Sequence, residues 1–256
     1  MHYSLHPDVC AFSTERGRVA DASAPYDGFN VTHYCGDAPE HVAACRQALC
    51  ADLGIGRDGL VLPRQTHGTC VVRVSRQTAP SELEGVDAVT TDEARLCIGV
   101  STADCLPLLL YDAEHHACAA VHAGWRGALA HIAARAVQAM QTDYGSRPEA
   151  LAGAIGPHIS LDSFEVGDEV FEAFADAGFP MQHIAMRYAA FDAPQAEKWH
   201  ISLSRAVLFS LQQAGVNTAH VSDCHVCTFQ HYDRFFSARR LGVQSGRIFT
   251  GVMLRG

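Results

Sequence analysis

The stretch LCIGVSTADCLPLLLYDAEHHACAAVHAGWRG, residues 96–127, decides the fold. It contains three apolar, β-rich runs, Leu96–Ser101, Leu106–Tyr111 and Ala117–His122, which are separated by short polar turns. No segment of helical period lies between these runs, so three strands follow one another along the chain. Consecutive strands, with the helices elsewhere, are typical of an α+β protein with mixed sheets rather than of a doubly wound parallel sheet.

Further strands and helices are expected on both sides of this stretch. The strands are Cys70–Ser75, Val86–Thr90, Leu151–Ile155, Ala219–Ser222 and Ile248–Leu254. Helical spacing of apolar residues predicts Pro39–Leu53, a helix that follows Gly127 and ends before Gly145, Gly167–Ala177 and Ser202–Ala214. Asp37 is expected to cap the first helix and Gly54 to end it. No linker or repeat divides the chain, so we expect one domain over residues 1–256, with helices that cover the sheets.

Composition and charge limit the classes of function. Hydrophobic residues make up 48% of the 256 residues and charged residues 18%, which is enough to bury a sizeable core. The net charge is −9, and a chain without a surplus of cations is not expected to bind a nucleic-acid polymer or an anionic membrane. The apolar region Leu96–Tyr111 is interrupted by Ser101, Thr102 and Asp104, so it is not expected to span a membrane.

The chain is rich in histidine and cysteine, with 15 and 10 residues. The cysteines are scattered through apolar stretches and do not have the spacing of a small disulfide-bonded scaffold. The first twelve residues do not have the pattern of a signal peptide, so we expect a cytoplasmic protein with reduced thiols. Cys224 and Cys227 form a C-x-x-C pair, but one such pair is a weak metal or redox signal, and we interpret it as structural.

Three segments place a metal-binding side chain at the end of a strand, beside Gly or Pro. They are RQTHG at 64–68, TADCLP at 102–107 and VHAGWRG at 121–127. Their His67, Cys105 and His122 are separated by 38 and 17 residues, which is too far for a zinc knuckle but suits three ligands that the fold brings together. One thiolate and two imidazoles suit a catalytic zinc ion with an open fourth position. On composition and spacing alone, three unrelated residues near turns remain the stronger interpretation.

These segments resemble the laccase-domain proteins of YfiH type, first described as multicopper polyphenol oxidases and now regarded as purine nucleoside phosphorylases with adenosine deaminase activity. The Q-x-H-G, T-A-D-C-L-P and H-A-G-W-R-G motifs of that family occur in the family's order at 65–68, 102–107 and 122–127. Outer segments are similar too, at 25–30, 36–37, 154–157, 164–167, 227–228, 235–237 and 239–240. The resemblance covers nearly the whole chain.

The resemblance implies a fold, a metal and a reaction. The fold would be the α+β, YfiH-like (cysteine-hydrolase-like) fold, with mixed sheets covered by helices. A zinc ion would be held by His67, Cys105 and His122, with copper as an alternative in vitro. The reaction would be phosphorolysis of adenosine, inosine, guanosine and, as a further candidate, methylthioadenosine to free base and ribose 1-phosphate, together with adenosine deamination. The partners would be a purine nucleoside and phosphate, and the protein a monomer or a homodimer.

Five further residues are candidates for the reaction, each with a structural alternative. Asp104 is the nearest carboxylate for proton transfer, or it caps a turn before Pro107 or orients a metal ligand. Arg126 can bind phosphate or ribose, or pair with a surface acid. Gln65 and Asn30 are candidates for substrate binding, or they satisfy nearby backbone groups. Arg240 belongs to a basic group, with arginines at 234, 239 and 247, that either steers phosphate or is a solvated face.

The chain departs from the family pattern near that basic group. Ala238 stands where the family usually has an aromatic residue, and residues 241–243 (LGV) replace an acidic, glycine-rich stretch.

Three other functions also stay open. Copper-dependent oxidation of phenols is disfavoured because none of the histidines forms a His-x-His pair. Cys105 could be the nucleophile of a hydrolase, including one that edits peptidoglycan precursors, or the chain could hold zinc without catalysis.

Overall fold

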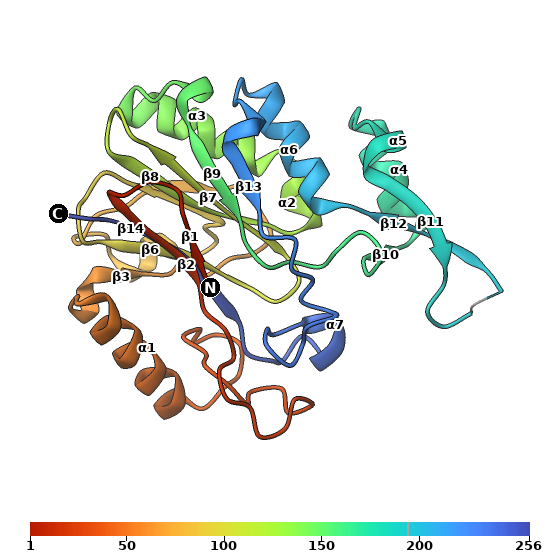
Figure 1. The fold of residues 1–256 in the computed structure, drawn as a ribbon, viewed down its shortest axis with the longest axis horizontal. Helices are drawn as coiled ribbons and strands as arrows, with labels where there is room; N and C mark the ends of the chain where they lie inside the picture. Colours follow the sequence, from red (N-terminus) through yellow and green to blue (C-terminus); the bar gives the residue numbers. More distant parts are fainter. Residues whose placement is uncertain (194) are drawn as a thin grey trace.

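Two mixed β-sheets pack face to face at the centre of the computed structural model, which describes residues 1–193 and 195–256 (Figure 1). The five-stranded sheet has the order β1 (His2–Tyr3), β2 (Val9–Ser13), β14 (Ile248–Leu254), β6 (Cys97–Thr102), β3 (Leu60–Val61). The six-stranded sheet has the order β13 (Val221–Asp223), β9 (Ala152–Ile155), β7 (Leu106–Asp112), β8 (Ala117–Ala123), β5 (Ala88–Thr91), β4 (Val71–Arg73). The pairs β3/β6, β4/β5 and β9/β13 are parallel, and the other pairs are antiparallel.

The strand period of two sorts the apolar side chains of β7 between two cores. Leu108 and Leu110 point to the core beneath the helices, whereas Leu109 and Tyr111 point to the core between the sheets. Both faces of β7 are therefore buried, as its nearly continuous apolar sequence requires. The prediction of an α+β protein with mixed sheets covered by helices is confirmed.

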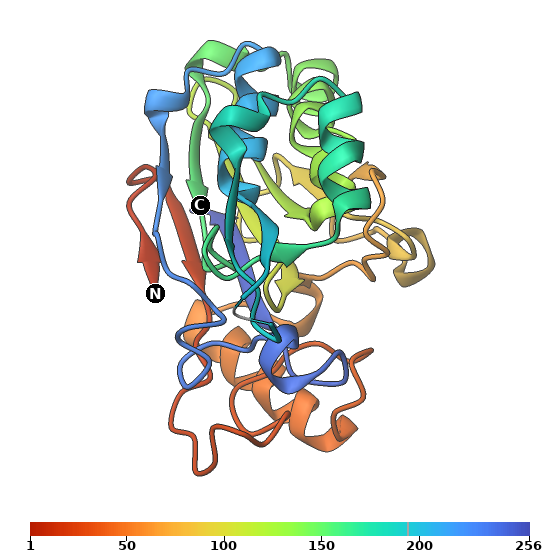
Figure 2. The same ribbon diagram turned by 90° about the vertical axis from the view of Figure 1, so that its right-hand side faces the viewer.

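Helices cover the outer face of each sheet. Helix α1 (Pro39–Leu53) packs on the five-stranded sheet, and α2 (Trp125–Leu129), α3 (Ile132–Tyr144) and α6 (Leu203–Gln213) pack on the six-stranded sheet (Figures 1 and 2). Gly54 ends α1 as predicted, with a left-handed φ of 64°. The prediction that Asp37 caps α1 is wrong: the cap position is Ala38, and Asp37 instead pairs with His41 one turn into the helix.

The helix that was expected after Gly127 is divided in two. Residues 130 and 131 separate α2 from α3, and His131 adopts a left-handed φ of 57°. Its imidazole stacks on Phe179 with ring centroids 4.8 Å apart, and its Nδ1 lies 2.7 Å from the hydroxyl of Ser210. These contacts offset the strain of the break, and the apolar stripe continues across it, which hides the break from the sequence.

A small sheet lies at one side of the molecule and was not predicted. Its order is β10 (Glu165–Val166), β12 (Glu197–Ile201), β11 (Ala185–Ala189), and α4 (Asp168–Asp176) and α5 (Met181–Ile184) lie beside it (Figure 1). The strand predicted at Ala219–Ser222 begins only at Val221, because residues 218–220 form a 3-10 turn that Asn217 caps. Short 3-10 turns also occupy Arg57–Gly59, Pro80–Leu83 and Pro148–Ala150, and a last helix, α7, spans Ala238–Leu241.

Among the described residues, no helix combines the length and the apolar character that crossing a membrane requires. The ten cysteines, all within the described part of the chain, are free thiols. The organisation as one domain over residues 1–256 stays a prediction.

Candidate metal centre

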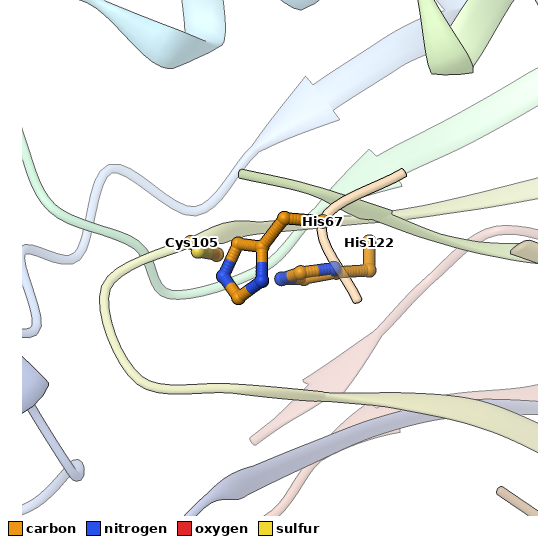
Figure 3. Close-up of side chains that lie close together, drawn as sticks. All are labelled: His67, Cys105 and His122. Atoms are coloured by element: carbon orange, nitrogen blue, oxygen red, sulfur yellow. The ribbon is translucent and has the colours of Figure 1, made fainter. Parts of the chain in front are cut away.

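His67, Cys105 and His122 meet at one end of the sheet sandwich. His67 lies in the loop between β3 and β4, Cys105 in the turn between β6 and β7, and His122 near the end of β8. Their ligand atoms all lie within 4.8 Å of one another, and the three side chains point toward a common centre (Figure 3). Tetrahedral zinc with bonds of about 2.0 to 2.3 Å would need ligand atoms roughly 3.3 to 3.7 Å apart, so a small contraction would suffice. The geometry fits a metal, and no fourth His, Cys, Asp or Glu of the described residues joins the cluster.

Asp87, which precedes β5, fixes two of the three ligands. Its Oδ1 accepts a hydrogen bond from Nδ1 of His122 at 2.8 Å and one from the backbone N–H of His67 at 2.9 Å. Its Oδ2 accepts from the backbone N–H groups of Gly68 at 2.8 Å and Thr66 at 3.2 Å. Because Asp87 engages Nδ1 of His122, Nε2 is the nitrogen left to bind a metal. A fully buried carboxylate therefore sets both the tautomer of His122 and the path of the His67 loop.

The backbone around the centre is tightly constrained. His67 and Asp104 have left-handed φ values of 62° and 86°, which cost about 1 to 3 kcal/mol each in residues other than glycine. Gly124 follows β8 with an ordinary φ of −69°, but a Cβ there would lie 2.7 Å from Cδ2 of His67 and 3.1 Å from Sγ of Cys105. The glycine of the H-A-G-W segment is thus required by the close approach of two ligands and not by its backbone angles.

Cys105 and His122 each shift the pKa of the other. Burial alone would raise the pKa of the Cys105 thiol, but the charge and hydrogen bonding of the two imidazoles outweigh it and lower the pKa from 9.0 to about 6. Burial would lower the pKa of His122, but the Cys105 thiolate and Asp87 raise it to about 9. A thiolate at neutral pH is the form that a metal binds.

A cavity of about 290 Å³ opens on the ligands. It is lined by Tyr34, Gln65, His67, Ser101, Thr102, Ala103, Cys105, His122, Ala238, Val243 and Arg247. The hydroxyl of Thr102 is buried and makes no hydrogen bond with any described residue. Ala238 and Val243, at two of the positions that depart from the family pattern, face this cavity. The departures therefore lie where a substrate would be contacted.

The two residues expected to be catalytic lie at the edge of this arrangement. Asp104 adjoins Cys105, but its Oδ1 accepts from the Thr228 hydroxyl and its Oδ2 from the backbone N–H of Arg239, both at 2.7 Å. Arg126 lies in the first turn of α2 and is exposed, with its guanidinium over the ring of Trp125 at 4.2 Å. Neither residue lines the cavity.

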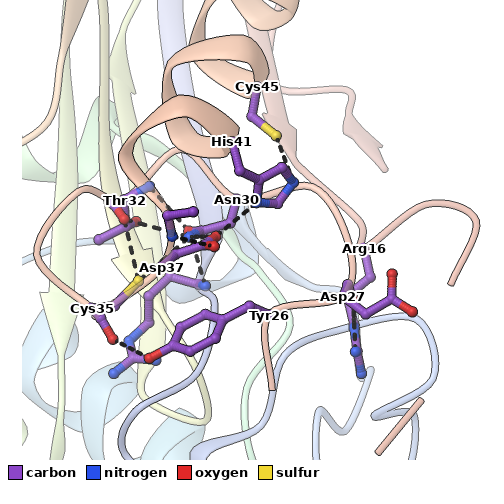
Figure 4. A network of polar contacts seen from close by, with 11 residues as sticks. Arg16, Tyr26, Asp27, Asn30, Thr32, Cys35, Asp37, His41 and Cys45 are labelled. Atoms are coloured by element: carbon purple, nitrogen blue, oxygen red, sulfur yellow. Dashed lines mark hydrogen bonds and ion pairs between the residues drawn. The ribbon is translucent and has the colours of Figure 1, made fainter. Parts of the chain in front are cut away.

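Of the three residues expected to bind substrate, only Gln65 lines the cavity. Its amide bridges the backbone of Ser101, with Nε2 donating to the carbonyl and Oε1 accepting from the N–H, both at 2.8 Å. Asn30 is fully buried, and its Nδ2 donates to Asp37 at 2.8 Å within the network that leads into α1 (Figure 4). Arg240 is exposed, stacks on Phe229 at 3.9 Å, and donates to the carbonyl of that residue.

Sequence reasoning missed Asp87 and the place of Thr102 in the site, and it named Arg247 only as one member of the basic group. Asp87 lies between Val86 and Ala88 in an apolar run. A carboxylate in such a run is expected to be buried, and a buried carboxylate needs a partner, which was the available signal of a role in the site. Thr102 was noted only as an interruption of the apolar region Leu96–Tyr111 and as the first residue of the TADCLP segment. Arg247 is the one member of the basic group that lines the cavity, where it is held by the carbonyls of residues 243, 245 and 246.

Comparison with known proteins identifies the family. A family model described as "Multi-copper polyphenol oxidoreductase laccase" matches residues 9–255. The chain belongs to this laccase-domain family. The laccase-domain chain is 40% identical to a protein of Bacteroides thetaiotaomicron named "Purine nucleoside phosphorylase", over 98% of this chain and 93% of that one. It is 41% identical to "Adenosine deaminase RL5" from an unknown prokaryotic organism, over 95% and 93% of the two chains.

A solved structure confirms the expected fold of the laccase-domain chain. The crystal structure of YlmD from Geobacillus stearothermophilus superimposes with a TM-score of 0.87 and is 25% identical, over 99% of this chain and 94% of that one. The resemblance to the YfiH-type family and its fold, expected from the three motifs, is therefore confirmed.

Proposed function

We propose that this protein is a zinc-dependent purine nucleoside phosphorylase that also deaminates adenosine. The observation that carries the proposal is the His67, Cys105 and His122 cluster on a cavity, in a chain whose relatives bear the names of both activities. A set of one sulfur and two nitrogen ligands suits zinc, and three protein ligands leave a position for water or substrate. The expected substrates are adenosine, inosine and guanosine, with methylthioadenosine as a further candidate.

Both reactions act on the same nucleoside at different atoms. In phosphorolysis a phosphate oxygen bonds to C1′ of the ribose, the bond from C1′ to N9 breaks, and the base leaves with the electron pair and takes up a proton. In deamination water adds at C6 and the amino group leaves as ammonia. A metal bound by the three ligands would polarise an oxygen atom and lower the pKa of water.

The residues around the cavity would bind and orient the substrate. The unpartnered hydroxyl of Thr102 is free to accept or donate a hydrogen bond to a ribose or base. Arg247 would supply positive charge at the mouth of the cavity for phosphate. Asp104, whose oxygens hold Thr228 and Arg239, would position the C-terminal segment over the cavity, and its role in proton transfer stays a prediction.

The proposal is tested by following base release and ammonia in one experiment. The protein is incubated with inosine or adenosine, with and without phosphate, before and after a chelator, and then with zinc or copper restored. Hypoxanthine release that needs phosphate, is lost with the chelator and returns with zinc is the expected result. The proposal fails if no nucleoside is consumed in the presence of zinc while a phenol is oxidised once copper is added.

Metal content tests the ligand set independently of turnover. Cys105→Ala should remove the bound metal, whereas Cys224→Ala, at a thiol of similar intermediate exposure away from the cavity, should retain it. Equal metal content in both variants would contradict the assignment.

A second candidate function rests on the acidity of Cys105. A thiol with a pKa of about 6 beside His122, whose other nitrogen is bonded to Asp87, has the arrangement of a cysteine nucleophile with its base and orienting acid. Alkylation with iodoacetamide separates the two functions, because zinc bound to the thiolate should protect it. Equally fast labelling of Cys105 with and without zinc would favour the hydrolase.

Cytoplasmic location and a monomeric or homodimeric state stay predictions.

A further inference from the structure

A second cavity, of about 310 Å³, is lined by β3 and by residues 75, 76 and 78, which follow β4. Strand β3 is the edge of the five-stranded sheet and β4 the edge of the six-stranded sheet. Helix α1 lies near β3 (Figure 1) and contributes Arg46 to the lining of the cavity. Four arginines line it, Arg46, Arg57, Arg64 and Arg76, together with His33. Only two carboxylates, Asp58 and Glu84, do so. A chain with a net charge of −9 thus gathers an excess of cations in one cavity.

Two of these arginines lack a counter-ion. Arg46 is half-buried on α1, and its Nη1 donates only to the carbonyl of Val31, at 3.3 Å. The guanidinium of the exposed Arg57 makes no hydrogen bond or ion pair with any residue that the structure describes. Burial removes water from the Arg46 guanidinium and lowers its pKa, which means that burial destabilises the charged form. The guanidinium nevertheless stays protonated. A half-buried cation with most of its five donors unused is costly to a fold unless an anion completes it.

The remaining arginines differ in how firmly they are held. Arg76 is fixed by Glu93, with Nε 3.2 Å from the carboxylate, and by the carbonyls of residues 94 and 95. Arg64 lies 3.6 Å from Glu84 in a pair that is more than half exposed on both sides. Such a pair contributes little, so Arg64 is free to turn to a ligand. Arg46, Arg57 and Arg64 are therefore three guanidinium groups that line one cavity and that no buried ion pair holds among the described residues.

A thin wall separates this cavity from the metal centre. The two cavities share no lining residue, but adjacent residues face opposite sides of the wall. His33 and Arg64 line the arginine cavity, whereas their neighbours Tyr34 and Gln65 line the metal cavity. The hydroxyl of Tyr34 donates to the carbonyl of Pro63 at 3.1 Å, which joins the two halves of the wall.

We propose that the arginine cavity binds a small anion with a diphosphate group, either inorganic pyrophosphate or a nucleotide. The guanidinium fork matches phosphate oxygens, and three available forks suit the roughly three negative charges that a diphosphate carries near neutral pH. The size of the cavity is that of a small-ligand site. The binding is separate from the proposed phosphorolysis, because it uses neither the metal ligands nor the residues of their cavity.

Calorimetric titration of the whole protein with pyrophosphate, and separately with ADP, tests this site. Arg46→Gln and Arg57→Gln should each raise the Kd at least about tenfold, since each removes a charge-assisted contact. The matched control is Arg135→Gln, an exposed arginine of α3 whose guanidinium donates only to a carbonyl, with the same loss of one charge; its Kd should stay within about twofold of the wild type. Melting curves of each variant establish that it is folded.

Each outcome has a defined meaning. Equal affinity for pyrophosphate and ADP supports an inorganic anion, and tenfold tighter binding of ADP supports a nucleotide. The proposal is overturned if the wild type shows no saturable binding of either compound at millimolar concentration, or if Arg46→Gln and Arg135→Gln bind alike. The same titration with Cys105→Ala should give wild-type affinity, so failure of the proposed function leaves this result unaffected.

Discussion

Replacing Asp87 with Asn tests whether Asp87, which is not a metal ligand in the proposed site, holds the ligands His67 and His122 in position. The substitution keeps the shape of the side chain but removes the charge and turns one acceptor oxygen into an NH2 group. In the wild type the two oxygens accept from Nδ1 of His122 and from the backbone N–H groups of His67, Gly68 and Thr66. An NH2 group at either position would face donors, so at least two hydrogen bonds to a charged acceptor would be lost.

The expected losses follow from those bonds. Hydrogen bonds to charged groups are worth about 1.5 to 3 kcal/mol each, so loss of two should lower the free energy of unfolding by roughly 3 to 6 kcal/mol. Metal affinity should fall about 10- to 100-fold, because His122 loses the partner that fixes its tautomer. Urea denaturation measures the first quantity, and competition with a chromogenic chelator measures the second, at a temperature where the variant is folded.

Asp112 provides the matched control. It is a buried carboxylate that lies 2.8 Å from Nδ1 of His115 and accepts from the backbone N–H groups of Glu114 and His115, away from the metal cavity. Asp112→Asn should therefore destabilise the fold while metal affinity stays within about twofold of the wild type. If Asp87→Asn also kept wild-type metal affinity, or if both variants lost it equally, the assignment of Asp87 as the positioning residue would be refuted.

Three further predictions use other parts of the structure. Gly124→Ala should lower metal content at least tenfold, measured by elemental analysis, because its Cβ would lie 2.7 Å from Cδ2 of His67 and 3.1 Å from Sγ of Cys105; metal content like that of the wild type would contradict this. Leu110→Ala, in the core under the helices, should lower the free energy of unfolding by about 2 to 5 kcal/mol in urea titrations and leave metal affinity unchanged. Although burial alone would raise the pKa of Asp112, its hydrogen bonds lower it below 3.8, so its contribution is complete above the unfolded pKa and is lost as the pH falls through the folded one. The destabilisation by Asp112→Asn should therefore shrink between about pH 5 and 2, and a difference that is independent of pH there would be the contrary result.

The centre of the fold was predictable because its signals are local. The apolar runs of residues 96–122 specify β6, β7 and β8, since strand residues buried on both faces leave an almost unbroken apolar sequence. The break at His131 was not predictable, because the stacking on Phe179 that accompanies it involves a residue 48 positions away. The sheet of β10, β11 and β12 escaped notice for a similar reason, since its strands are short and mostly half-exposed.

The candidate site was predictable only in its ligands. His67, Cys105 and His122 stand beside Gly or Pro at strand ends, where sequence reasoning looks for chemistry. Asp87 differs, because its role depends on facing His122 across paired strands, and one sequence does not give that register. Asn30 shows the opposite case: it lies in a segment shared with the family, yet its amide is used within the buried network before α1.

The position of the three ligands also bears on how the two large sheets are held together. His67 follows an edge strand of one sheet, His122 ends a strand of the other, and Cys105 lies in the turn that passes between them. A metal held by all three would act as a clasp across the sandwich, and its binding energy would become part of the folding energy. Free metal at a hundred times its Kd would add about 2.7 kcal/mol of stability, so a chelator should lower the melting temperature even of a variant that has no activity.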